Sequence, residues 1–161
     1  PGSTITGEKI RDILLNSKDD LSDEAELLLM FASRAQLIKE KVTNSDLDII
    51  LFDRFYDASI AYQGHGRDLS LDFINSLISF INCPTPDITF LLNISVEEGF
   101  SRKTDDVKDR IESSGFDFFN KVRDGYLNVA ELNTSRVKIL DASNSIEIVH
   151  NKIIEYVYKI L

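Results

Sequence analysis

An acid–arginine pair followed by a run of hydrogen-bonding residues is the part of this sequence best suited to chemistry. Residues 48–67 read DIILFDRFYDASIAYQGHGR, so an apolar run ends at Asp53 and Arg54 follows at once. A guanidinium carries a planar fork of donors and stays protonated, which suits bidentate contact with a phosphate. The neighbouring carboxylate can orient that arginine or hold a metal-bound water. A salt bridge at the end of a strand, without any ligand, explains the pair equally well when it is taken alone.

The residues after this pair favour the binding interpretation. Ser59 and Gln63 are polar, and Tyr62 has a flat face that can pack on a sugar. Gly64 and Gly66 allow a close approach of the backbone to a ligand. The stretch therefore predicts a pocket wall rather than a simple connecting loop.

The elements that position these residues follow an alternating pattern. Three short apolar runs predict buried strands over 48–53, 88–94 and 136–141. Strands that alternate with helices indicate a mostly parallel sheet, in which ligands bind beyond the carboxyl ends of the strands. The predicted helices cover about 24–42 with a capping box at Asp23 and Glu26, 71–82 with Ser70 as cap, a segment opened by Ser95 and Glu98, 115–131, and 146–160.

Composition narrows the class of protein. The net charge of −9 argues against nucleic-acid and anionic-membrane binding, because both reward basic surfaces. No apolar run approaches the roughly 20 residues of a membrane span, and residues 1–15 lack the pattern of a secretory signal. Cys83 is the only cysteine, which fits a reducing compartment. We therefore expect a single cytoplasmic domain over residues 1–161.

Several segments together resemble one enzyme family. DRFYDASIAYQGHGR is similar to the DR(Y/H)xxSxxAYQGxxR signature of thymidylate kinases, and ILDAS matches the strand and loop before their last helix. PGSTITGEKIRDILL resembles EPGGTxxGExIRxLLL, and AELLLMFASRAQL resembles AExLLFxAxRAQ. DRIESSGFDFFNKVRDGY resembles DRxExxxxxFxxxVRxxY. The resemblance covers essentially the whole chain.

This resemblance implies a P-loop kinase-like α/β fold, a parallel sheet flanked by helices. It also implies phosphorylation of dTMP to dTDP by ATP with Mg²⁺, in a homodimer that pairs through helices. The family begins with a strand and a GxxGxGKST loop that cradles the ATP phosphates, and neither occurs in this sequence. We therefore expect the N-terminal strand and the phosphate loop to be absent from this chain.

The resemblance places the acceptor phosphate on arginines. Arg54 is the candidate catalytic residue that binds the dTMP phosphate, assisted by Arg34 from the 24–42 helix. Arg34 could instead be a solvated arginine on a helix face. Asp53 is the candidate metal-binding residue, and Ser59 completes this part of the predicted substrate site.

The same resemblance assigns the nucleoside to three further side chains. Phe31 would stack on thymine, although an ordinary core position is the alternative. Tyr62 would lie against the sugar C2′ and disfavour a ribose hydroxyl. Gln63 would hydrogen-bond the base or its surroundings.

The donor nucleotide is assigned to two other segments. Residues 101–113 resemble a lid that closes over ATP, with Arg102 as the candidate catalytic arginine; a solvated charged loop is the alternative. The loop after the last predicted strand would contact adenine through Ala142, Ser143 and Asn144, or else only cap the final helix. A lid arginine fits phosphoryl transfer, where catalysis is mostly positioning and charge stabilisation.

Two other functions stay open on the sequence alone. One is a different nucleoside or nucleotide kinase of the same fold. The other is a truncated, inactive relative that only binds nucleotides, because ATP would lack its phosphate cradle.

Overall fold

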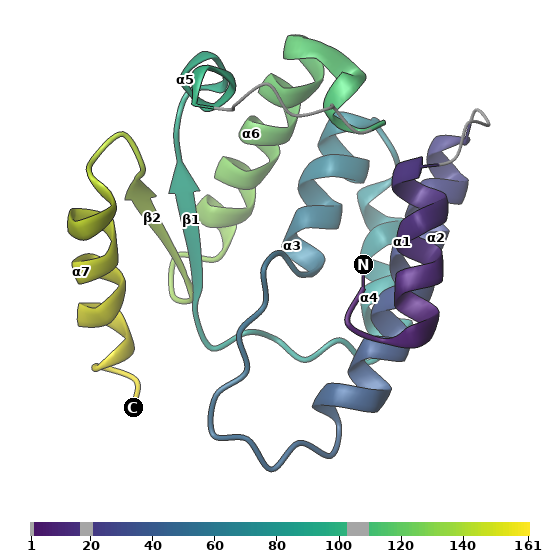
Figure 1. Ribbon diagram of the computed structural model, residues 1–161, viewed down its shortest axis with the longest axis horizontal. Coiled ribbons are helices and arrows are strands. Elements are labelled where there is room, and N and C mark those ends of the chain that lie inside the picture. Colours follow the sequence, from purple (N-terminus) through teal and green to yellow (C-terminus); the bar gives the residue numbers. More distant parts are fainter. Residues whose placement is uncertain (1, 17–20, 103–109) are drawn as a thin grey trace.

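The computed structural model describes residues 2–16, 21–102 and 110–161, and these ranges contain a helix-rich chain around a small sheet (Figure 1). The elements are α1 (Ile5–Asn16), α2 (Asp23–Leu37), η1 (Ile38–Val42), α3 (Tyr56–Ser59), η2 (Ile60–Gly66), α4 (Leu71–Phe80), β1 (Thr89–Asn93), α5 (Val96–Ser101), η3 (Glu112–Ser114), α6 (Gly115–Leu132), β2 (Val137–Asp141) and α7 (Ile146–Val157). Here η1 and η2 are π-helical segments and η3 is a 3₁₀ turn. The predicted lid at 101–113 includes residues 103–109, which lie outside the described residues.

The sheet is parallel, as predicted. Strands β1 and β2 pair with Leu91 opposite Ile139. Helix α7 covers one face, where Tyr156 contacts Phe90 with ring centroids 6.1 Å apart. Helix α6 covers the other face, where its last turns pack on Val137 (Figure 1). The predicted strands over 88–94 and 136–141 and the α/β class are therefore confirmed.

The predicted strand over 48–53 is wrong, because these residues have no regular structure. A strand needs a hydrogen-bonded partner, and within the described residues β1 pairs only with β2. The segment is not buried on two faces either, since Leu51 is 90% exposed and Ile49 is 51% exposed. The segment is apolar, but no strand among the described residues pairs with it.

Helix starts follow the serine caps. The hydroxyls of Ser70 and Ser95 accept hydrogen bonds from the amides three residues ahead, which confirms both predicted caps. Helix α2 is the exception, because its cap is Ser22 and not Asp23. Ser22 has an extended backbone, so its hydroxyl reaches the Ala25 amide at 3.2 Å. Glu26, expected in a capping box, is buried instead.

The packing of α6 against η2 fixes the segment that carries the predicted pocket wall. Val122 and Phe118 of α6 share a buried cluster with Ala61 of η2. Gly125 allows the two segments to approach closely, because a Cβ there would lie 2.8 Å from the Cβ of His65. The π-helical turn thus rests on the longest helix of the chain.

Candidate functional site

Arg54 lies on a strained backbone. Its φ is 63°, in the left-handed region that residues other than glycine rarely adopt. Such strain costs about 1–3 kcal/mol and concentrates at functional sites. Asp53 and Arg54 are both exposed, and the guanidinium carbon lies 5.1 Å from the centroid of the Tyr62 ring. The backbone therefore presents a cation over an aromatic face at the surface.

A second arginine approaches the same segment from α2. Arg34 donates from Nη2 to Ser59 Oγ at 3.0 Å and to the carbonyl oxygen of Phe55 at 3.3 Å. Its Nη1 atom is buried without a hydrogen-bond partner, and its charge lies 4.6 Å from the Phe31 ring centroid. Burial lowers the pKa of the Arg34 guanidinium to about 10.

These contacts place Arg34 next to the segment that carries Arg54. Arg34 is anchored on the carbonyl of Phe55, the residue directly after Arg54, so its guanidinium lies against the backbone segment that carries Arg54. A buried donor without an acceptor is costly, and an incoming anion with several oxygens removes that cost. We call this group the double-arginine site; it consists of Phe31, Arg34, Arg54, Ser59 and Tyr62.

The aromatic wall of this site is continuous with α6. The Tyr62 ring makes edge contacts with Phe118, Phe119 and Tyr126, with centroids 6.0, 6.3 and 6.2 Å away. Burial raises the pKa of Tyr126, and the nearby Tyr62 adds to the shift while Arg54 opposes it. Sequence reasoning assigned no role to Tyr126. The only signal was its place at the end of the VRDGY motif.

Gln63 lies beside Tyr62 but its amide is used elsewhere. The side chain is 2% exposed, and Nε2 donates to Glu26 Oε1 at 2.8 Å. The structure therefore brings Tyr62 to Arg54. It brings Phe31 and Ser59 to Arg34, and it directs Gln63 toward α2.

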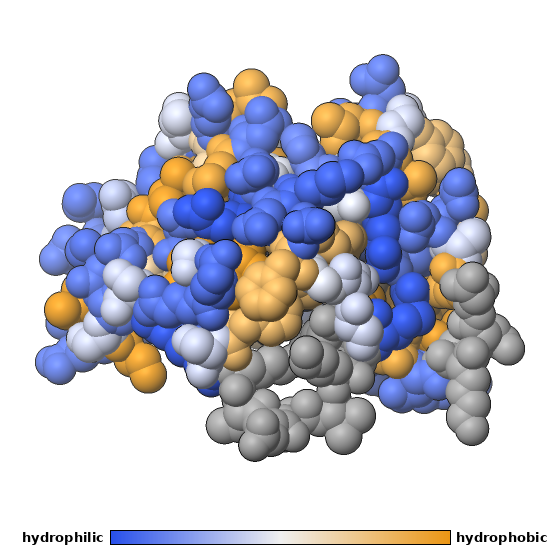
Figure 2. Space-filling model, turned by 90° about the horizontal axis from the view of Figure 1, so that it is seen from above, coloured by the Kyte–Doolittle hydropathy of each residue, from blue (hydrophilic) through white to orange (hydrophobic). Residues whose placement is uncertain are grey.

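The residues predicted to bind ATP, the phosphate donor, form a second group at the carboxyl end of the sheet. Arg102, just after α5, donates from Nη1 to the Ala142 carbonyl at 2.7 Å and lies 3.4 Å from that of Ser143. Asn144 donates to the Asp141 carbonyl at 3.0 Å, and hydrogen bonds from Ser143 lower the pKa of Asp141. We call Arg102 and residues 142–144 the Arg102 site. Hydrophilic side chains prevail on this face, with apolar groups between them (Figure 2).

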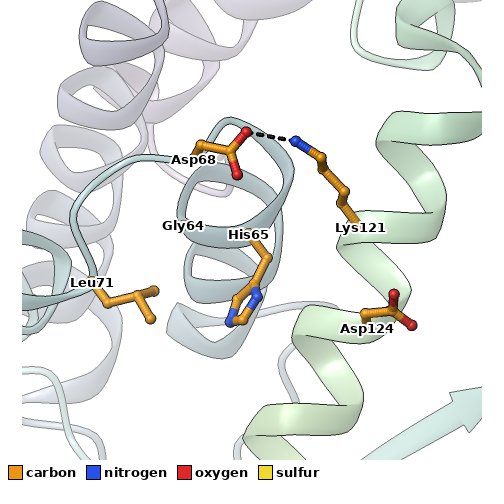
Figure 3. A pocket seen from close by; sticks show the side chains of 6 residues that line it. All are labelled: Gly64, His65, Asp68, Leu71, Lys121 and Asp124. Carbon is orange, nitrogen blue, oxygen red and sulfur yellow. Dashed lines mark hydrogen bonds and ion pairs between the residues drawn. The ribbon is translucent and has the colours of Figure 1, made fainter.

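A separate cavity of about 270 Å³ adjoins η2 and α6 (Figure 3). It shares no lining residue with either group above. Lys121 and Asp68 close one side through an ion pair of 2.6 Å. The lining residues are Gly64, His65, Asp68, Leu71, Lys121 and Asp124.

Metal ligands are sparse in the part of the chain that the structure describes. No group of three or more His, Cys, Asp or Glu side chains is arranged to hold an ion there. Asp53 is a single exposed carboxylate next to Arg54. Such a donor fits Mg²⁺, which commonly takes one or two carboxylates together with substrate phosphates and water.

Comparison with known proteins identifies the family. The family model for thymidylate kinase matches residues 1–153. The chain belongs to the thymidylate kinase family. It is 41% identical over 168 residues to the thymidylate kinase of Prosthecochloris aestuarii, covering 96% of this chain and 75% of that protein. It is also 41% identical to the thymidylate kinase of Acinetobacter baylyi, covering 98% of this chain and 80% of that protein.

A solved structure supports the same assignment. The crystal structure of thymidylate kinase from Ehrlichia chaffeensis aligns with a TM-score of 0.79 at 28% identity, covering 98% of this chain and 77% of that one. The protein is therefore a phosphotransferase with the P-loop kinase-like α/β fold of this thymidylate kinase family. None of the helices in the described ranges is long and apolar enough to cross a membrane.

Proposed function

We propose that this protein transfers the γ-phosphoryl group of ATP to dTMP, with the acceptor phosphate held in the double-arginine site. The buried Nη1 of Arg34 is the observation that carries this assignment, because that donor has no hydrogen-bond partner among the described residues. A dTMP phosphate between Arg34 and Arg54 supplies the missing acceptor and neutralises both charges.

The remaining residues of the site suit a deoxynucleoside. Phe31 is 2% exposed, and its ring centroid lies 4.6 Å from the Arg34 guanidinium carbon, which puts an aromatic ring next to the proposed base position. Tyr62, fixed by three aromatic neighbours, lies beside the sugar and leaves no room for a ribose hydroxyl. Gln63 acts on the base through its surroundings, since its amide donates to Glu26.

The transfer itself requires charge stabilisation more than covalent chemistry. The bond between the γ-phosphorus and the bridging oxygen of ADP breaks while an oxygen of the dTMP phosphate forms the new bond. Arg54 holds that nucleophile in line and offsets the repulsion between two phosphates. Arg102 faces the donor, with Ala142, Ser143 and Asn144 lining the adenine side.

Asp53, directly before Arg54 of the double-arginine site, is a suitable carboxylate for Mg²⁺. Asp53 would hold the ion through a bound water, and the ion would neutralise charge on the phosphates being transferred. Arg54, on its strained backbone, follows Asp53 directly in the chain.

Two features of the organisation complete the proposal. A homodimer that pairs through helices is supported by Leu28 on α2, which is 50% exposed, and by Phe73 on α4, also 50% exposed. Light scattering of the natural protein and of its Leu28→Lys variant tests the dimer, which the variant should dissociate.

A cytoplasmic location is supported by the lone thiol of Cys83.

The function is tested in the natural full-length protein with ATP, Mg²⁺ and a panel of dTMP, dUMP, dCMP and thymidine. We expect dTMP to have the highest kcat/KM. Arg54→Ala should nearly abolish turnover, whereas Lys9→Ala, an exposed position on α1, should leave it unchanged. Unchanged activity in Arg54→Ala would remove Arg54 from the site, and a preference for another acceptor would replace dTMP as substrate.

A further inference from the structure

A carboxylate with no solvent contact lies where four segments meet. Glu26 in the first turn of α2 is 0% exposed. Its Oε1 accepts from Gln63 of η2 at 2.8 Å, and its Oε2 accepts from Nη2 of Arg110. Nη2 of Arg67 lies 3.5 Å from the same Oε2. One buried negative charge therefore holds two arginines and one amide.

Both arginine partners of Glu26 are anchored a second time. Arg110 donates from Nε to the carbonyl of Leu14 at the end of α1, at 3.1 Å. Arg67 donates to Ser114 Oγ at 3.3 Å, and its guanidinium lies 4.5 Å from the Phe118 ring centroid. The carboxylate thus joins α1, α2, η2 and the chain from Arg110 into α6. We call Glu26, Gln63, Arg67 and Arg110 the Glu26 clamp.

The Glu26 clamp and the double-arginine site are connected by two residues that are adjacent in the sequence. Gln63 is the neighbour of Tyr62, and both belong to η2, a seven-residue π-helix. A π-helix is rare and has poorer intrinsic stability than an α-helix, so tertiary contacts must hold its geometry. The hydrogen bond from Gln63 to Glu26 is such a contact. Tyr62, the residue before Gln63, has its ring under the Arg54 guanidinium.

We infer that Glu26 is a positioning residue for the acceptor site: acting through Gln63, it fixes the π-helical turn that aims Tyr62 at Arg54. Removal of its charge takes the buried carboxylate away from Arg110 and leaves Arg67 with Asp23, whose Oδ1 lies 3.2 Å from its Nε. The consequence for dTMP rests on the function proposed above. The consequence for the geometry of η2 does not.

The experiment compares Glu26→Gln with Glu24→Gln in the natural full-length protein. Glu24 lies on the same helix and is exposed, so it is a matched control. Removal of the Glu26 charge should raise KM for dTMP about tenfold, while KM for ATP stays within about twofold. Amide hydrogen exchange should accelerate in residues 60–66 and stay unchanged in α7. Glu24→Gln should change none of these.

A second variant keeps the inference testable if Glu26→Gln does not fold. Gln63→Met removes one hydrogen bond but keeps the charge and both arginines, and it should raise KM for dTMP by about threefold with faster exchange in η2. If either folded variant loses thermal stability with KM for dTMP and η2 exchange both unchanged, Glu26 is only a fold-stabilising residue and the inference is overturned. If η2 loosens while the unaltered protein does not phosphorylate dTMP, the proposed function fails and the clamp stands.

Discussion

The double-arginine site and the Arg102 site are built in opposite ways. Arg34 approaches its site from inside the protein, on α2, with its Nη1 buried and its Nη2 fixed by two hydrogen bonds. Arg102 lies at the surface, where its side chain is 48% exposed and its ion-pair partner Glu98 is 40% exposed. The first arginine is held by buried contacts, whereas the second is held by contacts that water competes for. Under the proposed function, acceptor binding is therefore preorganised and donor binding is less so.

The largest effect should come from Arg34→Met. A long apolar side chain keeps the packing on Phe31 but removes the phosphate donor, so kcat/KM for dTMP should fall about 10³-fold. The same change removes a buried, partly unpaired charge, so the free energy of unfolding should rise by about 1 kcal/mol. Kinetics and urea denaturation, with Lys9→Met as the control, separate the two. A fall in both quantities would mean that Arg34 is structural and that the site is not preorganised.

The contrast between buried and exposed contacts can also be tested with two ion pairs, one buried and one at the surface, through their contributions to the free energy of unfolding. Asp57 of α3 and Arg136 are 7% and 11% exposed and are joined by two contacts of 2.7 Å. Asp57→Asn should lower the free energy of unfolding by about 3 kcal/mol, because the arginine is left buried without its partner. Glu98→Gln, which breaks the surface pair with Arg102, should change it by less than about 0.5 kcal/mol. Equal effects in urea denaturation would contradict the larger contribution expected of the buried ion pair.

Two glycine substitutions probe how tightly each region is packed. In Gly125→Ala the new Cβ would meet the Cβ and ring of His65 at 2.8 Å, so α6 and η2 must separate, at a cost of about 2 kcal/mol. In Gly99→Ala on α5 the nearest atom is 3.7 Å away, and the higher helix propensity of alanine should stabilise the protein by about 0.5 kcal/mol. Thermal unfolding measures both. A destabilised Gly99→Ala would show that the donor side is packed as closely as the acceptor side.

The smallest effect should be a dependence of acceptor binding on pH. Burial lowers the pKa of Arg34 to about 10, and a phosphate binds only the protonated guanidinium. The Arg34 charge is therefore lost at a lower pH than that of an exposed arginine, so KM for dTMP should rise as the pH is raised from 8 towards 10. Because the folded pKa is lowered, the free protein should gain stability between about pH 10 and the ordinary arginine pKa, where only the unfolded chain still binds the proton. Arg34→Met should abolish both dependences.

The sequence predicted those elements whose signals are local. Ser70 and Ser95 cap helices because a serine hydroxyl reaches an amide three residues ahead, whatever surrounds it. Apolar runs of strand length gave β1 and β2 nearly to the residue. The failure at 48–53 has a physical reason, because an apolar run becomes a strand only when another strand pairs with it.

The sequence by itself determined the family and the parallel α/β class, since these depend on motif residues and on short-range patterns. Only the tertiary structure decided what those residues do. It left Arg34 Nη1 without an acceptor, turned the amide of Gln63 toward Glu26 and brought Tyr126 against Tyr62. The last two of these features are contacts between residues 37 or more positions apart in the sequence. Burial and hydrogen-bond partners at that separation are set by how helices pack, and no local spacing encodes them.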